Sequence, residues 1–218
     1  AIKRVGKIII DFLAQIEDFQ KKLWLKKKFV VETNWCITLD KIDESFWAEI
    51  IANKAQIEEW IAMYAIDEAE GWSNPPTVEF LRQNQNLIVD TKHFSNTFKY
   101  ALLESIPNLD EQTDGLMVHS ENFQALNLLY NRYGGAVSCC YYDPPYNTSE
   151  NTFLYKNGYK DSSWASMMAD RISATKPYLK GSGVLCTAID DYEHSLLGQL
   201  LDQNFGFENR LGNLVVEI

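Results

Sequence analysis

The segment Asp143-Pro144-Pro145-Tyr146 brings together residue types that could do chemistry. Each proline fixes φ near about −65° and removes a backbone N–H donor. The segment is therefore a rigid corner that is rich in acceptors and poor in donors, with the flat ring of Tyr146 beside it. Such a corner suits a ligand that donates hydrogen bonds, such as an amine.

We expect the ligand to be the exocyclic amine of a base. The N6 lone pair of adenine is delocalised into the ring, so this nitrogen is a poor nucleophile. The Asp143 carboxylate and the Pro144 carbonyl can accept both N6 hydrogens, which localises the lone pair and stabilises positive charge during in-line attack on a methyl sulfonium. The base must flip out of its duplex, and stacking on Tyr146, worth about 1–3 kcal/mol, offsets part of that cost. Asn147 and Thr148 either shape the loop or contact the base.

Strands and helices alternate around this corner. The apolar run 136–142 leads directly into Asp143 and predicts a strand that is buried on both faces of a parallel sheet. Ligands of open α/β sheets bind at the carboxyl ends of such strands. The other expected elements are a strand over 116–118, a helix over 121–130, a helix over 161–179, a turn over 180–183, a strand over 184–189, a helix over 191–203 and a strand over 214–218. This alternation predicts an α/β fold with a doubly wound, Rossmann-like sheet.

Residues 1–75 predict a separate, mainly helical N-terminal module. Its expected elements are an amphipathic helix over 1–28, an extended segment over 29–39 and a second helix over 43–66. The sequence Gly71-Trp72-Ser73-Asn74-Pro75-Pro76 breaks the second helix and predicts a domain boundary. Residues 76–218 are then the N-terminal part of a catalytic domain.

The net charge of −10 is unusual for a protein that grips DNA. Either the basic surface is local, or the gripping region lies outside this chain. One basic cluster lies at the end of the first predicted helix and is either a phosphate-contacting patch or a solvated helix end: Lys21, Lys22, Lys26, Lys27 and Lys28. No apolar run reaches the roughly 18 residues of a membrane span.

The four cysteines contain no C-x-x-C pair, which makes a zinc site unexpected. We expect buried free thiols in a reducing cytoplasm. Asp190 and Asp191 follow the second buried strand, where a paired-carboxylate or metal role competes with helix capping.

Several segments in order resemble the modification subunits of type III restriction systems, which are amino-group DNA methyltransferases. Tyr142 to Thr148 resembles the family's D-P-P-Y motif. The segment from His119 to Leu126 is similar to its G-D-N-x-x-A-L, with Ser120-Glu121-Asn122 in place of G-D-N. Phe153 to Lys156 and Trp164 to Met168 follow the motif, and Gly183 to Glu193 resembles a strand that ends in I-D-D-x-E. The resemblance covers about residue 86 to the end.

The resemblance implies transfer of a methyl group from S-adenosylmethionine to adenine N6 in DNA. It assigns catalysis to Asp143, Pro144, Pro145 and Tyr146, and a cofactor-side role to Glu121 and Asn122. The implied partners are DNA and a restriction subunit or a second modification subunit, in the cytoplasm and without a membrane. The family's glycine loop, F-x-G-x-G, is absent, and the chain lacks an initiator Met and stops inside an expected strand. We therefore expect a fragment that lacks the recognition region and the glycine loop, binds cofactor poorly and is inactive alone.

Three alternatives stay open. Cytosine-N4 enzymes more often have Ser in place of the motif acid, and methyltransferases of protein glutamine or RNA usually have Asn-Pro-Pro-Tyr. The acid at Asp143 disfavours both. A third alternative, from another class, is a non-catalytic module that binds a partner subunit through its N-terminal helices.

Overall fold

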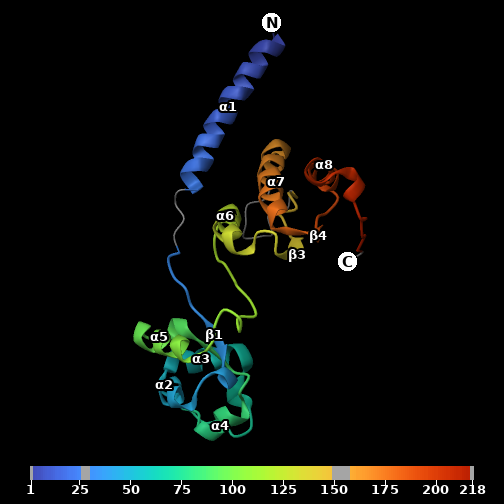
Figure 1. Cartoon of the computed structure of the whole chain (residues 1–218). Helices are drawn as coiled ribbons and strands as arrows, with labels where there is room; N and C mark the ends of the chain where they lie inside the picture. The colour runs from blue at the N-terminus through green and yellow to red at the C-terminus, as the bar shows by residue number, and fades with distance from the viewer. Residues whose placement is uncertain (1, 26–29, 149–157, 217–218) are drawn as a thin grey trace. The chain divides into compact units, whose positions relative to one another are not determined.

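The computed structural model describes residues 2–25, 30–148 and 158–216. The chain forms two compact units, Phe29–Met117 and Ala1–Lys28 together with Val118–Ile218. Each unit contains helices and a small two-stranded sheet, and Figure 1 labels most of these elements. The predicted mixture of helix and sheet is therefore confirmed at this level.

The unit 29–117 is built around a short antiparallel pair, β1 (Cys36–Thr38) and β2 (Ile88–Asp90). Its helices are α2 (Trp47–Ala52), α3 (Lys54–Tyr64), α4 (Val78–Gln83) and α5 (Asn96–Ser105). Short 3-10 turns lie at Leu39–Lys41, Glu44–Phe46, Ile66–Glu68 and Thr91–His93.

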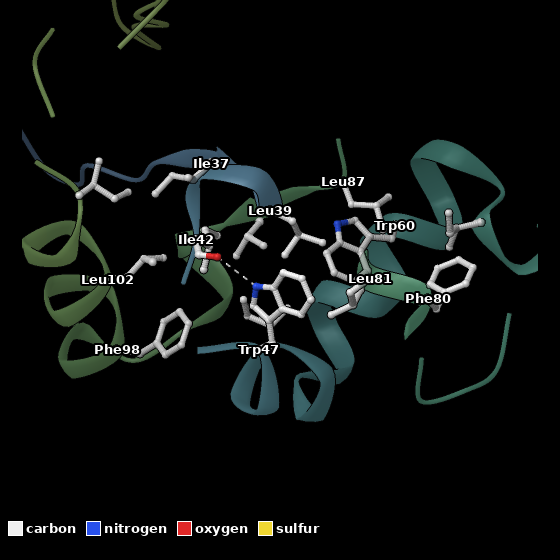
Figure 2. Packing of buried hydrophobic residues seen from close by; sticks show 14 residues of the cluster. Ile37, Leu39, Ile42, Trp47, Trp60, Phe80, Leu81, Leu87, Phe98 and Leu102 are labelled. Carbon is white, nitrogen blue, oxygen red and sulfur yellow. Dashed lines mark hydrogen bonds between the residues drawn. The ribbon is translucent and has the colours of Figure 1, made fainter. Parts of the chain in front are cut away.

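The core of this unit pairs its buried polar groups internally. Trp47 donates its indole N–H to the Ile42 carbonyl at 3.2 Å. Figure 2 draws this bond as a dashed line. Trp60 donates in the same way to the Ile88 carbonyl at 2.6 Å. The fully buried Gln56 donates to Ile88 O at 3.2 Å and accepts from the Asp90 N–H at 2.7 Å. An unpaired buried polar group costs about 1–3 kcal/mol, so these bonds preserve the stability of the core.

The domain boundary lies elsewhere than at residue 75, where the sequence analysis placed it. The ring of Trp72 packs edge-on against Phe80 with centroids 5.3 Å apart, so the chain stays in the same core on both sides of the break. Strand β2 then pairs with β1, which joins residues after 76 to those before it. The unit continues to Met117, because β-pairing and packing outweigh a local Gly/Pro signal.

The predicted helix over 43–66 is also divided. Asn53 adopts an extended backbone (ψ 102°) and its side chain accepts from the Gln56 N–H at 3.1 Å, so it ends α2 and caps α3. An amide side chain that satisfies the next helix's free N–H favours such a break. Of the predicted extended segment 29–39, the structure describes residues 30–39, and within these only β1 forms a strand.

The unit containing residues 118–216 has a parallel pair, β3 (Val137–Tyr142) and β4 (Leu179–Thr187), joined through α7 (Asp161–Thr175). Helix α6 (Asn122–Tyr133) precedes β3, and α8 (His194–Phe205) follows β4. Short 3-10 turns lie at Lys176–Tyr178 and Phe207–Asn209. The core joins α7 to α8 through Trp164, Met168, Ile172, Leu197 and Leu200.

One face of the β3–β4 pair is open, whereas the sequence predicted burial on both. Tyr142 packs against the α7–α8 core, but Tyr141 is 64% exposed. Cys139 and Cys186 are also exposed, so the prediction of buried thiols is wrong for them, as it is for Cys36. The predicted turn over 180–183 lies within β4, next to a register irregularity between Val137 and Cys139. A Cβ on Gly183 would lie 2.9 Å from Val137 O, so glycine here permits close strand approach.

Helix α1 (Ile2–Leu25) confirms the predicted amphipathic helix. Its apolar stripe is exposed within the described residues, with Phe12 60% exposed. None of the described helices combines the length and the apolar content needed to cross a membrane. The strands predicted over 116–118 and 214–218 are wrong for the described residues, because these segments have no ladder partner and Met117 is 95% exposed.

Candidate active site

The Asp143-Pro144-Pro145-Tyr146 segment leaves β3 at the carboxyl end of a parallel strand, as predicted. Strand β3 ends at Tyr142, whose carbonyl accepts from the Ala188 N–H at 2.8 Å. Asp143 is exposed, Pro144 is buried, and Pro145 and Tyr146 are half-buried. The acid therefore lies at the surface while the prolines anchor the loop.

Two side chains hold this loop in place. Trp164, fully buried in α7, donates its indole N–H to the Pro145 carbonyl at 2.8 Å. Asn147 adopts a left-handed backbone with φ 62°. Its amide nitrogen donates to Tyr159 O at 3.1 Å and to the buried Glu193 carboxylate, and its oxygen accepts from the Tyr159 N–H. Asn147 thus shapes the loop, one of the two roles that the sequence left open.

The two acceptors that the proposed chemistry needs are not used internally. Among the described residues, no hydrogen bond or ion pair involves the Asp143 carboxylate or the Pro144 carbonyl oxygen. Neighbouring positions are committed, since the Pro145 carbonyl accepts from Trp164 and the Asn147 amide is fully bonded. The loop is therefore fixed around two acceptors that remain available.

A pocket of about 320 Å³ lies beside these acceptors. It brings together predicted site residues from two segments, Asn122 from α6 and Asp143, Pro144 and Pro145 from the loop. The remaining lining residues are Leu126, Tyr141, Tyr142, Met167, Met168 and Arg171. The predicted residues Tyr146, Asn147 and Thr148 are not part of this lining.

The turn before α6 is held by Arg171, a residue that the sequence analysis missed. Glu121 caps α6, with one carboxylate oxygen accepting from the Gln124 N–H at 3.1 Å. Its other oxygen is 2.5 Å from Arg171 Nη2, and Asn122 Oδ1 accepts from Arg171 Nε at 2.6 Å. An arginine 50 positions from its acid leaves no spacing signal in a sequence, so only the fold could reveal it.

Tyr142 links the end of β3 to α7. Its hydroxyl donates to the Arg171 carbonyl at 3.0 Å and bonds to Thr175 Oγ1. Burial raises the pKa of Tyr142 above its usual value, an effect that the Thr175 bond partly offsets. The phenol therefore stays neutral near pH 7 and keeps its proton for these bonds.

Asp190, the first acid after β4, bonds to the nearby backbone. Asp190 accepts from the Tyr192 N–H at 2.9 Å, which closes a turn ahead of α8, and the helix cap position is taken by Glu193. No group of three His, Cys, Asp or Glu side chains among the described residues could hold a metal ion. Of the basic cluster, Lys26–Lys28 and the side chains of Lys21 and Lys22 lie outside what the structure describes.

Residues 137–217, which include the loop and most of the pocket, match the model of the DNA methylase family of N6 and N4 methyltransferases. The chain is 30% identical over 137 residues to a probable type III restriction-modification enzyme HindVI Mod subunit of Haemophilus influenzae, covering 60% of this chain and 18% of that protein. It is 31% identical over 122 residues to the type II methyltransferase M.KpnI of Klebsiella pneumoniae, covering 52% and 29%.

The EcoPI Mod subunit of Escherichia phage P1 is 26% identical over 135 residues, covering 48% of this chain and 21% of that protein. The chain thus spans less than a third of the length of each of these relatives. The resemblance to restriction-modification DNA methyltransferases is confirmed by the family match and by these relatives.

Proposed function

We propose that the full-length protein transfers a methyl group from S-adenosylmethionine to the N6 nitrogen of adenine in DNA, within a restriction-modification or related defence system. One observation carries the proposal. The Asp143 carboxylate and the Pro144 carbonyl are uncommitted among the described residues, at the edge of a pocket and on a loop that Trp164 and Asn147 hold in place.

The proposed mechanism uses these acceptors directly. Asp143 and Pro144 each accept one hydrogen of the amino group of a flipped-out adenine, which localises the nitrogen lone pair. The lone pair forms the new N–C bond as the C–S bond breaks, and the electron pair of the C–S bond remains on sulfur. The leaving N6 proton passes through the Asp143 carboxylate to water. Because the acceptors are held before the base arrives, they stabilise the positive charge of the transition state without reorganising.

S-adenosylmethionine, when bound, supplies the electrophilic methyl group on a sulfonium. The pocket fits part of such a ligand, since the Asn122 amide and the apolar side chains of Leu126, Met167 and Met168 lie beside Asp143. Asn122 and the neighbouring Glu121 are the residues that would face it. The rest of the cofactor site, including a glycine loop, belongs in this proposal to other parts of the full-length protein.

Three broader proposals accompany this one. The β3–α7–β4 unit forms part of a larger Rossmann-like sheet, and residues 118–218 form the first part of the catalytic domain.

Tyr146 stacks on the flipped base, and Thr148 contacts the base or its backbone. The full-length protein is cytoplasmic and works with a restriction subunit or a second modification subunit, as suggested by relatives whose names include Mod subunits.

Cytosine-N4 methylation is the second candidate, because the matched family includes both N6 and N4 enzymes. An N4 amino group presents the same pair of hydrogens to Asp143 and Pro144. The proposal favours adenine because Asp occupies the position where N4 enzymes more often have Ser.

Labelled cofactor and unmodified DNA, incubated with the full-length protein and then digested to nucleosides, test this proposal. We expect the label in N6-methyl-2′-deoxyadenosine. Label in N4-methyl-2′-deoxycytidine supports the second candidate instead. Label only in protein or RNA contradicts both candidates and favours a methyltransferase of protein or RNA. No transfer at all favours a non-catalytic assembly module.

A further inference from the structure

Arg171 lies where the two sides of the candidate site meet. It is contributed by α7 and lines the same pocket as Asn122, Asp143 and Pro144. Its side chain is only 20% exposed, so its interactions are less screened than those of a surface arginine.

Two of the three side-chain nitrogens of Arg171 bind the turn before α6, and the third bonds within α7. Nε donates to Asn122 Oδ1 at 2.6 Å, Nη2 donates to Glu121 Oε1 at 2.5 Å, and Nη1 donates to the Met167 carbonyl at 3.0 Å. The planar guanidinium presents these donors in a fixed fork, so both neighbouring side chains are held in one orientation.

The backbone of the same residue is tied to the loop. The Tyr142 hydroxyl donates to the Arg171 carbonyl, and Tyr142 directly precedes Asp143. Residue 171 therefore connects the end of β3, through its carbonyl, with Glu121 and Asn122, through its guanidinium. These links fix how far the α6 turn lies from the two acceptors.

We propose that Arg171 is a positioning residue that sets Glu121 and Asn122 against the methyl-acceptor corner and thereby sets the affinity for the cofactor; this rests on the function proposed above. Arg171 does not touch the reacting atoms in this proposal. Its loss weakens cofactor binding and leaves the chemical step nearly intact, because Asp143 and Pro144 are held independently by Trp164 and Asn147.

Steady-state kinetics of the full-length protein test this inference with Arg171→Gln and Arg171→Lys. We expect both variants to raise the KM for S-adenosylmethionine about tenfold or more, with kcat within about threefold of the unsubstituted protein. Lysine fails to restore binding because a single ammonium cannot hold both side chains. The matched control is Arg210→Gln, which removes a similar fork to Asp202 away from the pocket and leaves both constants unchanged.

A milder variant guards against misfolding. Glu121→Gln keeps an acceptor for the α6 cap and weakens only the ion pair, and calorimetry reports its cofactor affinity directly. We expect weaker binding, and the double variant Glu121→Gln/Arg171→Lys should bind no worse than Arg171→Lys alone, because the two residues act as a unit. A fall in kcat at unchanged KM, full rescue by lysine, or strictly additive losses in the double variant would overturn the inference. Failure of the proposed function is seen instead in the unsubstituted protein, as an absence of methyl transfer.

Discussion

The two units of this chain differ in whether their polar groups are hydrogen-bonded within the unit. In residues 29–117, buried donors and acceptors satisfy one another, as Gln56 does with Ile88 and Asp90. In residues 118–216, Trp164 and Asn147 satisfy the parts of the loop around the site, while Asp143 and Pro144 stay available. The first unit resembles a closed core, and the second combines a small core with an open sheet face and a pocket. Under the proposed function, stability and chemistry therefore belong to different parts of the sequence.

The largest expected effect tests whether the first unit is an independent core. Trp60→Ala removes a fully buried indole and its bond to Ile88 O, which should destabilise residues 29–117 by about 3–5 kcal/mol. Hydrogen exchange should accelerate there, while amides of 118–216 keep their protection. Loss of protection in both regions together would show that they unfold as one cooperative core, which contradicts the independence of the two units.

The next effect concerns chemistry alone. Asp143→Ala in the full-length protein should lower kcat by about 10²–10³, because one acceptor for the developing charge is lost. Its melting temperature should hardly change, since Asp143 is exposed and has no partner among the described residues. Asp191→Ala, an exposed carboxylate outside the pocket lining, serves as control and should retain full activity. Undiminished turnover in the Asp143 variant would remove it from the mechanism.

Substituting one buried tryptophan in each unit compares the effects of the two units on stability and on kcat. Trp164→Phe leaves the Pro145 carbonyl without its donor, and Trp47→Phe does the same to Ile42. Each should cost about 1–3 kcal/mol of stability in urea denaturation. Only Trp164→Phe should also lower kcat, by about tenfold or more, because it frees the loop that carries Asp143. Equal kinetic effects of the two substitutions would contradict the division of roles.

The smallest expected effect is the acid sensitivity of the first unit. Burial alone raises the pKa of Glu59, but hydrogen bonds from Lys92 and His93 outweigh it and hold the pKa below its usual value. The stabilisation is therefore present above the unfolded pKa, about 4.3, and is lost as pH falls through the lower folded pKa. Glu59→Gln should therefore reduce the loss of unfolding free energy at acid pH by under about 1 kcal/mol. The control variant Glu58→Gln, on the exposed side of α3, should leave the pH dependence of the unfolding free energy unchanged.

The sequence predicted the strand that leads into the candidate site better than it predicted the fold around that strand. The strand leading into Asp143 was predictable, because an apolar run before an Asp-Pro-Pro motif is a local signal. The bonds that fix the loop were not, since Trp164, Glu193 and Arg171 meet their partners only through the fold. The boundary near residue 75 failed for the same reason. Pairing of β1 with β2 joins segments that are far apart in the chain, and no local pattern encodes it.

The left-handed backbone of Asn147 limits which residues this position can accept. Glycine adopts φ 62° without strain but provides none of the three bonds to Tyr159 and Glu193. Aspartate can accept from the Tyr159 N–H, yet it places a second carboxylate against Glu193, so the pair would have to share a proton. A substitution that looks isosteric thus makes the shape of the loop depend on acidity. If the loop binds a base as proposed, a redesign of base preference has to begin at other positions and keep this asparagine fixed.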